Sequence, residues 1–195
     1  MADFKKLTET LESLGYTVSS FATAAEAADY LDGAIDGVSV GIGGSITVKE
    51  MGLYPRLSAH NKVIWHWEGA PYTDADHTDV YISSVNGLAE TGEIINIDGN
   101  CNRVTSAMYG HKKVYLVVGS NKIAPDYDSA LWRARNIAAP LNAQRLNKNT
   151  PCAVKGDKCY NCKSPDRICR ALTVLWCKPT PIEIEVVLVD EKLGY

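Results

Sequence analysis

The sequence has 195 residues, of which 46% are apolar and 22% are charged, an ordinary globular composition that excludes a disordered chain. Its 20 Lys and Arg against 23 Asp and Glu give a net charge of -3, which argues against a nucleic-acid partner. No apolar stretch approaches the roughly 20 residues of a membrane-spanning helix, and the start lacks the apolar core of a secretory signal. We therefore expect a cytoplasmic protein with no membrane partner.

The first elements follow from apolar spacing. Apolar residues three and four positions apart predict an amphipathic helix over residues 4–14, ended by Gly15. Residues 16–21 are rich in β-forming side chains and predict a strand. Thr23 as N-cap, with Glu26 completing a capping box, predicts a helix that runs to about residue 35.

A glycine-rich turn comes next, between a buried-type strand that starts near residue 37 and a predicted helix over residues 45–51. Backbone N–H groups at such a turn face an anion, so a phosphate or carboxylate is expected to bind at Gly43, Gly44, Ser45 and Thr47. The turn is neither a Walker A motif nor a complete G-x-G-x-x-G, because Ile46 takes the place of the third glycine. The same small residues also suit a tight strand-to-helix connection without a ligand.

The middle and end of the chain alternate strands with helices. Strands are predicted at residues 62–67, 80–83, 93–97, 113–118 and 182–189, and helices at residues 102–109 and 126–137. This order predicts one α/β domain over residues 1–195, with a mostly parallel twisted sheet flanked by helices and an antiparallel hairpin around residues 79–98. Alternation along the strand at residues 62–67 places Trp65 and Trp67 on one face and His66 on the other, which favours core packing.

Polar residues gather at the ends of these predicted strands. Such ends face a ligand-binding crevice in open α/β sheets, so candidate binding residues there are Asn96, Asp98, Arg103, Asn121 and Lys122. Lys122 would neutralise an acidic ligand. Glu90 is the candidate catalytic residue, as a nucleophile or general base, although its spacing alone favours a solvated hairpin carboxylate.

Residues 150–177 form a cysteine-rich segment. A C-x6-C-x2-C-x6-C spacing predicts a four-thiolate metal site made by Cys152, Cys159, Cys162 and Cys169. Nearby Lys and Arg residues would stabilise thiolates, and the expected compartment disfavours disulfides. Iron–sulfur and zinc both fit, and we favour a 4Fe-4S cluster with zinc as the alternative. Cys101 or Cys177 could replace one of the four, and a structural metal is as consistent as a redox one.

Several stretches resemble the LUD-domain family of lactate-utilisation proteins, in particular its short clostridial-type members with a cysteine-rich tail. The stretches are residues 40–47, 89–104, 117–123, 135–143, 150–152, 159–162, 166–169 and 193–194. The resemblance implies a fold similar to the sugar-phosphate isomerase and CoA-transferase superfamily. In its CoA transferases the nucleophile is a Glu followed two residues later by Gly, and Glu90-Thr91-Gly92 is similar by analogy.

The resemblance also implies iron–sulfur redox partners and the oxidation of L-lactate to pyruvate, although the sequence has no flavin or nicotinamide fingerprint. Three hypotheses follow. The chain is an iron–sulfur protein of lactate or related organic-acid utilisation that binds a small anionic metabolite. Alternatively, it is a CoA-transferase-like or sugar-phosphate-isomerase-like enzyme that uses Glu90 beside a structural zinc, or a non-catalytic assembly subunit. The sequence leaves open whether the chain forms a homo-oligomer.

Overall fold

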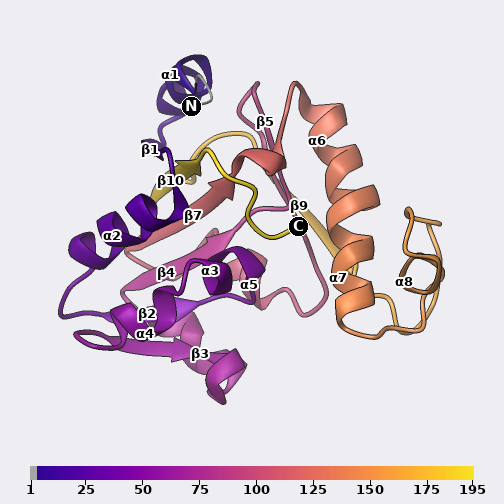
Figure 1. Cartoon of the computed structure of the whole chain (residues 1–195), viewed down its shortest axis with the longest axis horizontal. Coiled ribbons are helices and arrows are strands. Elements are labelled where there is room, and N and C mark those ends of the chain that lie inside the picture. The colour runs from indigo at the N-terminus through magenta and orange to yellow at the C-terminus, as the bar shows by residue number, and fades with distance from the viewer. Residues whose placement is uncertain (1–3) are drawn as a thin grey trace.

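A computed structural model describes residues 4–195, and its main sheet is built from parallel strands (Figure 1). Residues 1–3 lie outside the described residues, and the prediction that the start has no secretory signal includes them. The strand order is β1 (Thr17–Phe21), β10 (Glu183–Val189), β7 (Lys113–Gly119), β4 (Val80–Ser84), β2 (Ser39–Ile42) and β3 (Lys62–Trp65). The predicted α/β class is confirmed, and the predicted strands lie within one or two residues of these bounds.

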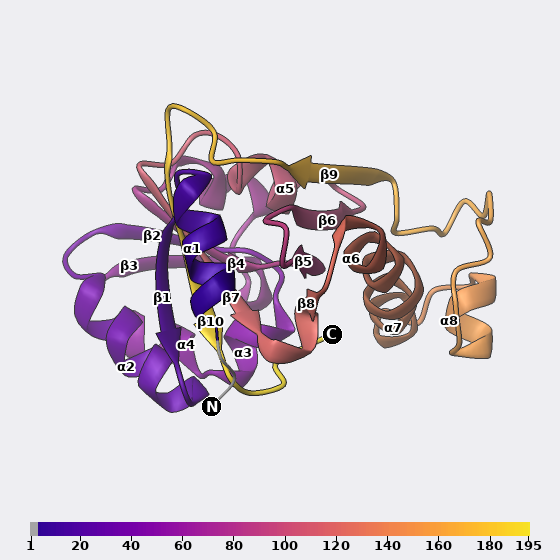
Figure 2. The ribbon, with the colours of Figure 1, turned by 90° about the horizontal axis from the view of Figure 1, so that it is seen from above.

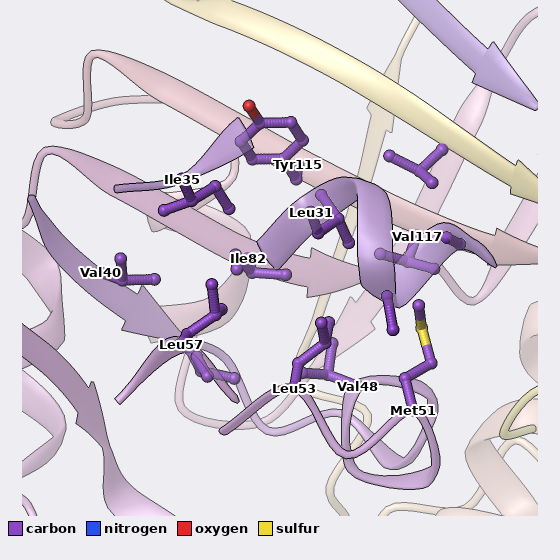
Figure 3. Packing of buried hydrophobic residues seen from close by; sticks show 14 of the residues in the cluster. Leu31, Ile35, Val40, Val48, Met51, Leu53, Leu57, Ile82, Tyr115 and Val117 are labelled. Carbon is purple, nitrogen blue, oxygen red and sulfur yellow. The ribbon is translucent and has the colours of Figure 1, made fainter. Parts of the chain in front are cut away.

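Helices cover both faces of this sheet, which explains why its central strands are continuous apolar runs. On one face lie α2 (Ala24–Ala34), α3 (Ile46–Glu50) and α4 (Leu53–Leu57), whose side chains pack on Ile82 and Val117 (Figure 3). On the other face, α1 (Lys5–Ser13) buries Leu7 and Leu11 against alternate residues of β7 and β10. The helical spacing of apolar residues and the apolar strands that were predicted from the sequence therefore locate the core correctly.

The start of α2 at Thr23 and the end of α1 at Gly15 are where the sequence predicts them, and Ser45 is a cap that was not predicted. Thr23 caps α2 by accepting a hydrogen bond from the backbone N–H of Glu26, whose side chain accepts one from the N–H of Thr23. Ser45 caps α3 through the N–H of Val48. Gly15 follows α1 with φ of 90°, a left-handed conformation that favours glycine. These local signals set where the chain enters and leaves the sheet.

A second sheet corrects the single-sheet prediction. Its strand order is β8 (Ile123–Ala124), β5 (Gly87–Ala89), β6 (Ile94–Asp98) and β9 (Ala171–Leu175). The hairpin predicted at residues 79–98 is only the β5–β6 pair, because β4 belongs to the main sheet. The short β8 and the distant β9 complete the sheet, and neither pairing is visible in local sequence.

One long helical segment lies beside the second sheet. It consists of α6 (Tyr127–Arg133), a π-helical turn (Ala134–Ala138) and α7 (Ala139–Arg145), so it continues well past the predicted end at residue 137. Pro140 favours a helix end because it has no N–H to donate, but it sits in the first turn of α7, directly after the π turn. The local change of hydrogen bonding accommodates the proline.

The cysteine-rich segment follows this helix and lies on the far side of it from the main sheet (Figure 2). It begins with α8 (Pro151–Lys155), and residues 156–170 then contain no helix or strand. The chain returns as β9 to the second sheet and as β10 to the main sheet. None of the helices in residues 4–195 is long and apolar enough to cross a membrane.

Candidate functional site

A cavity of about 470 Å³, the main cavity, lies where the parallel strands end. Gly44 to Thr47 follow β2, His66 follows β3, Ser84 ends β4, and Lys122 lies three residues after β7. The second sheet, α7 and the cysteine-rich segment form its other walls. This position at the carboxyl ends of the strands is where open α/β sheets bind ligands.

Lys122 is buried in the wall of the main cavity, with 4% of its surface exposed. Its Nζ donates hydrogen bonds to Ser84 Oγ at 2.8 Å and to Thr47 Oγ1 at 2.9 Å. Burial, and to a smaller extent the neighbouring cations Arg133 and Arg103, together lower the pKa of Lys122 to about 7 against a weaker opposing effect of Glu50. The lysine therefore titrates near neutral pH.

Arg103, at the start of α5 (Asn102–Ser106), joins the two sheets. Its guanidinium pairs with Asp98 at 3.2 Å and donates to Asn96 Oδ1 and the Ile97 carbonyl, each at 2.7 Å. It also donates to Asn86 Oδ1 and the Ser84 carbonyl. Because these acceptors come from both sheets, Arg103 fixes the floor of the main cavity.

The main cavity is cationic although the whole chain is acidic. Its lining includes two Asp residues, Asp98 and Asp166, and six Lys or Arg residues, namely Arg103, Lys122, Arg145, Lys148, Arg167 and Arg170. Arg103 already neutralises Asp98, so the remaining lining charges are mostly positive. Such a concentration of positive charge in a concave site attracts small anions.

The predicted binding residues divide into two layers. Those that line the main cavity are Gly44, Ser45, Thr47, Asp98, Arg103 and Lys122. Gly43, Asn96 and Asn121 lie behind them. A Cβ at Gly43 would be 2.6 Å from the Tyr81 hydroxyl, Asn96 supports Arg103, and Asn121 accepts from the Leu193 N–H. The three residues behind the lining position the wall.

Glu90 does not line the main cavity, so the structure does not bring it together with the other predicted crevice residues. Strand β5 begins beside Asn86 at the cavity, and at about 3.3 Å per residue it carries Glu90 roughly 13 Å away. Glu90 is exposed in the β5–β6 turn, and nearby Gly92 packs against Leu14 after α1. The polar runs at the two ends of this hairpin therefore do not meet.

Aromatic residues in the wall were missed because the strand after residue 62 is shorter than predicted. β3 ends at Trp65, and a 3-10 turn (His66–Glu68) brings both His66 and Trp67 to the main cavity. His66 stacks on Tyr72 at 4.4 Å, and burial lowers its pKa. The Arg145 guanidinium lies 5.2 Å from the Trp67 ring centre. The cluster Trp65-His66-Trp67 was visible in sequence, but not its change of direction.

A second cavity of about 240 Å³, the cysteine cavity, is lined by all four predicted ligands, Cys152, Cys159, Cys162 and Cys169, whereas Cys101 and Cys177 lie outside its lining. Arg167 donates to Cys169 Sγ at 3.3 Å and to the Cys162 carbonyl at 3.0 Å. Its Nε is buried without a hydrogen-bond partner. No three His, Cys, Asp or Glu side chains among residues 4–195 converge closely enough to hold a single metal ion.

The two cavities share a wall. Five residues line both of them, namely Ile97, Ala139, Arg167, Ile168 and Arg170. The long helix contributes to both, through Arg135 and Pro140 on the cysteine side and Asn142 and Arg145 on the other. A group held by the thiols would therefore be separated from a ligand in the main cavity by about one layer of side chains.

The chain was compared with known families and structures. The model of the LUD domain matches residues 4–189. A DUF162 family protein from Deinococcus radiodurans superposes with a TM-score of 0.57 at 14% identity, covering 94% of each chain, and this likeness supports the fold. No curated protein matches.

Two sugar-phosphate isomerases match less closely. The ribose 5-phosphate isomerase from Plasmodium falciparum gives a TM-score of 0.34 at 10% identity, covering 52% of each chain. A D-ribose-5-phosphate isomerase in complex with phospho-erythronic acid gives a TM-score of 0.36 at 15% identity, covering 58% of this chain and 55% of the other.

Proposed function

The chain belongs to the LUD domain family, and from this premise we propose that it binds a small organic acid in the main cavity beside an iron–sulfur cluster held by Cys152, Cys159, Cys162 and Cys169. The observation that carries the proposal is the shared wall between a cationic cavity with a buried lysine and a cavity lined by four thiols. Neither feature alone distinguishes an enzyme of organic-acid metabolism from a binding protein.

The chemistry of the main cavity supports an anionic ligand. Lys122 has two hydroxyl acceptors and no carboxylate within hydrogen-bonding range in the described chain, so no acidic side chain competes with an incoming anion for its amine. Arg145 and Lys148 lie at the same cavity and are exposed. A volume of about 470 Å³ suits a small molecule.

The chemistry of the cysteine cavity supports a cluster over a lone ion. A zinc ion needs four sulfurs about 2.3 Å from one point, whereas the four thiols line a cavity of about 240 Å³, which has room for a larger group. The unpartnered Nε of Arg167 suits an inorganic sulfide acceptor, which a cluster provides and a zinc ion lacks. A bound cluster would supply one-electron transfer, and the residues of this chain would hold it, exclude solvent and tune it through Arg167.

Anaerobic purification with iron, sulfide and zinc analysis tests the cluster. We expect iron and acid-labile sulfide in equal amounts with a broad visible absorption band, both lost in Cys162→Ser. The matched control is Cys177→Ser, which removes an exposed cysteine outside the cysteine cavity and is expected to keep the wild-type iron content. A colourless protein with one zinc per chain would overturn the cluster and leave a structural metal.

Thermal unfolding with lactate, pyruvate and phosphate tests the anion site separately. A ligand at a hundred times its dissociation constant stabilises the folded state by about 2.7 kcal/mol, so a rise in Tm that saturates with ligand concentration is expected. A flat response to all three anions, equal to that of sodium chloride, would contradict binding in the main cavity. The anaerobic protein should be used, so that cluster loss does not obscure the result.

A further inference from the structure

The hydrogen bonds around Lys122 specify more than a positive charge, and the inference drawn from them rests on the proposed anion site. Two hydroxyls contact the Nζ atom, Thr47 Oγ1 and Ser84 Oγ. Thr47 donates its own hydrogen to the Leu193 carbonyl at 3.1 Å, and Ser84 donates its hydrogen to the Val117 carbonyl at 2.6 Å. Both hydroxyls must therefore act as acceptors toward the lysine.

This arrangement matches a neutral amine. A neutral amine has two N–H donors and one lone pair, and the two hydroxyls use both donors. The lone pair is then left in the remaining direction, on a lysine that lines the main cavity. Because the hydroxyl hydrogens are committed to backbone carbonyls, neither hydroxyl can occupy the lone pair by donating to it.

The charges around Lys122 also favour the neutral form. Arg133 of α6 and Arg103 of α5 are its cationic neighbours, and Glu50 of α3 is its acidic one. Arg133 is anchored on the carbonyls of Asn121 and Asn86, and Glu50 accepts from the Gly194 N–H at 2.7 Å, so each is held by other groups. A buried lysine beside fixed cations is a recognised way to make an amine nucleophilic at neutral pH.

We propose that Lys122 is a nucleophile that forms an imine with a small anion carrying an aldehyde or ketone. The Nζ lone pair attacks the carbonyl carbon, and the C=O π electrons move to the oxygen, which gains a proton to give a carbinolamine. Loss of water, made of the carbonyl oxygen and the two amine hydrogens, leaves a C=N bond. The positive lining holds the carboxylate or phosphate of the same molecule.

Reductive trapping tests this step. Wild-type protein is incubated at neutral pH with pyruvate, a keto carboxylate, or with glycolaldehyde phosphate, an aldehyde phosphate, in the presence of sodium cyanoborohydride. Hydride from the reagent converts the imine to a stable secondary amine. We expect one adduct per chain, of the mass of the probe less one oxygen, and peptide mapping should place it on Lys122. The probe that reacts identifies a carboxylate or a phosphate ligand.

Three variants separate the nucleophile from the charge. Lys122→Met removes both and is expected to lose the adduct and most of the anion stabilisation. Lys122→Arg keeps the charge without a nucleophilic amine, so it should lose only the adduct. Lys62→Met is the control, because Lys62 is an exposed lysine at the start of β3, outside the lining of the main cavity, and it should label like the wild type.

The outcomes distinguish the imine from the anion site. Stabilisation by the probes without an adduct overturns the nucleophile and leaves the proposed function standing. Neither stabilisation nor adduct overturns both. Labelling of Lys122→Met at the wild-type rate also overturns the proposal, because the adducts then come from other lysines. If the Lys122 variants fail to fold, the wild-type peptide map alone decides, since an adduct on any other lysine contradicts the assignment.

Discussion

The main cavity and the cysteine cavity share a wall but are held in place by different means. The main cavity is fixed by buried groups at strand ends, where Lys122 is held by Thr47 and Ser84 and Arg103 bonds to both sheets. The cysteine cavity is bounded by residues 156–170, which form no helix or strand. The fold therefore preorganises the main cavity, whereas the cysteine cavity would depend on the metal group that we propose for its thiols.

The largest difference should appear on metal removal. We expect chelation under anaerobic conditions to open residues 156–170 to trypsin, because the proposed metal group would be the cross-link of this segment, which has no helix or strand. Lys158, Lys163 and Arg167 are the expected cleavage sites, and mass spectrometry of the fragments identifies them. The main sheet should keep its circular dichroism. Equal protection before and after metal removal would show that both cavities are preorganised.

Arg103→Met tests how strongly buried groups hold the main cavity in place. It leaves Asp98, whose side chain is 11% exposed, without its partner, and a broken buried ion pair costs about 3–5 kcal/mol. Urea denaturation measures this loss. The exposed pair of Arg56 and Asp29 provides the control, since Arg56→Met should cost far less. Equal losses in the two variants would mean that Arg103 does not join the sheets energetically.

Lys122 should make stability depend on pH. Its pKa is about 7 in the folded chain and 10.5 in the unfolded one, so between these values the unfolded chain binds more protons and stability rises with pH. From about pH 7 to 9, the unfolding free energy of the wild type should rise by about 2 kcal/mol relative to Lys122→Met. Parallel pH profiles of the two proteins would show that Lys122 stays charged.

Arg167→Met should give the smallest effect, and it tests whether Arg167 helps the cysteine cavity to retain the proposed cluster. It removes the donor to Cys169 and the unpartnered Nε while leaving all four thiols in place. Losing such an outer hydrogen bond typically costs about 10–100-fold in metal affinity. The rate of iron loss to a chelator measures this effect, with Lys163→Met as the control, because Lys163 is exposed and outside the cavity lining. Equal rates would remove Arg167 from the site.

The main sheet could be predicted from the sequence because its signals are local. The apolar spacing of residues 4–14, the capping box at Thr23 and the Val-rich strands each report on a few neighbouring residues. The second sheet could not, because β8 has two residues and β9 pairs with β6 across more than seventy positions of sequence. Long-range pairing leaves little trace in one sequence.

The candidate site shows the same division. Lys122 and Thr47 were found because polar residues that follow parallel strands gather at one edge. Glu90 was expected at the crevice because the sequence does not show which end of a short strand faces the cavity. Glu90 follows β5 and lies at the turn end, away from the main cavity. Arg145 and Asn142 were missed because the helix was expected to end before Pro140, so nothing predicted that residues beyond it reach the main cavity.

The π-helical turn at Ala134–Ala138 limits which insertions and deletions the long helix can tolerate. The turn holds one residue more than an α-helical turn would, and the helix beyond it lines both cavities, with Asn142 and Arg145 at the main cavity and Pro140 and Ala143 at the cysteine cavity. Deleting a single residue there would restore α-helical geometry and rotate everything beyond it by about 100°. Substitutions can therefore accumulate along this helix, whereas a change in its length would turn Asn142 and Arg145 away from the main cavity.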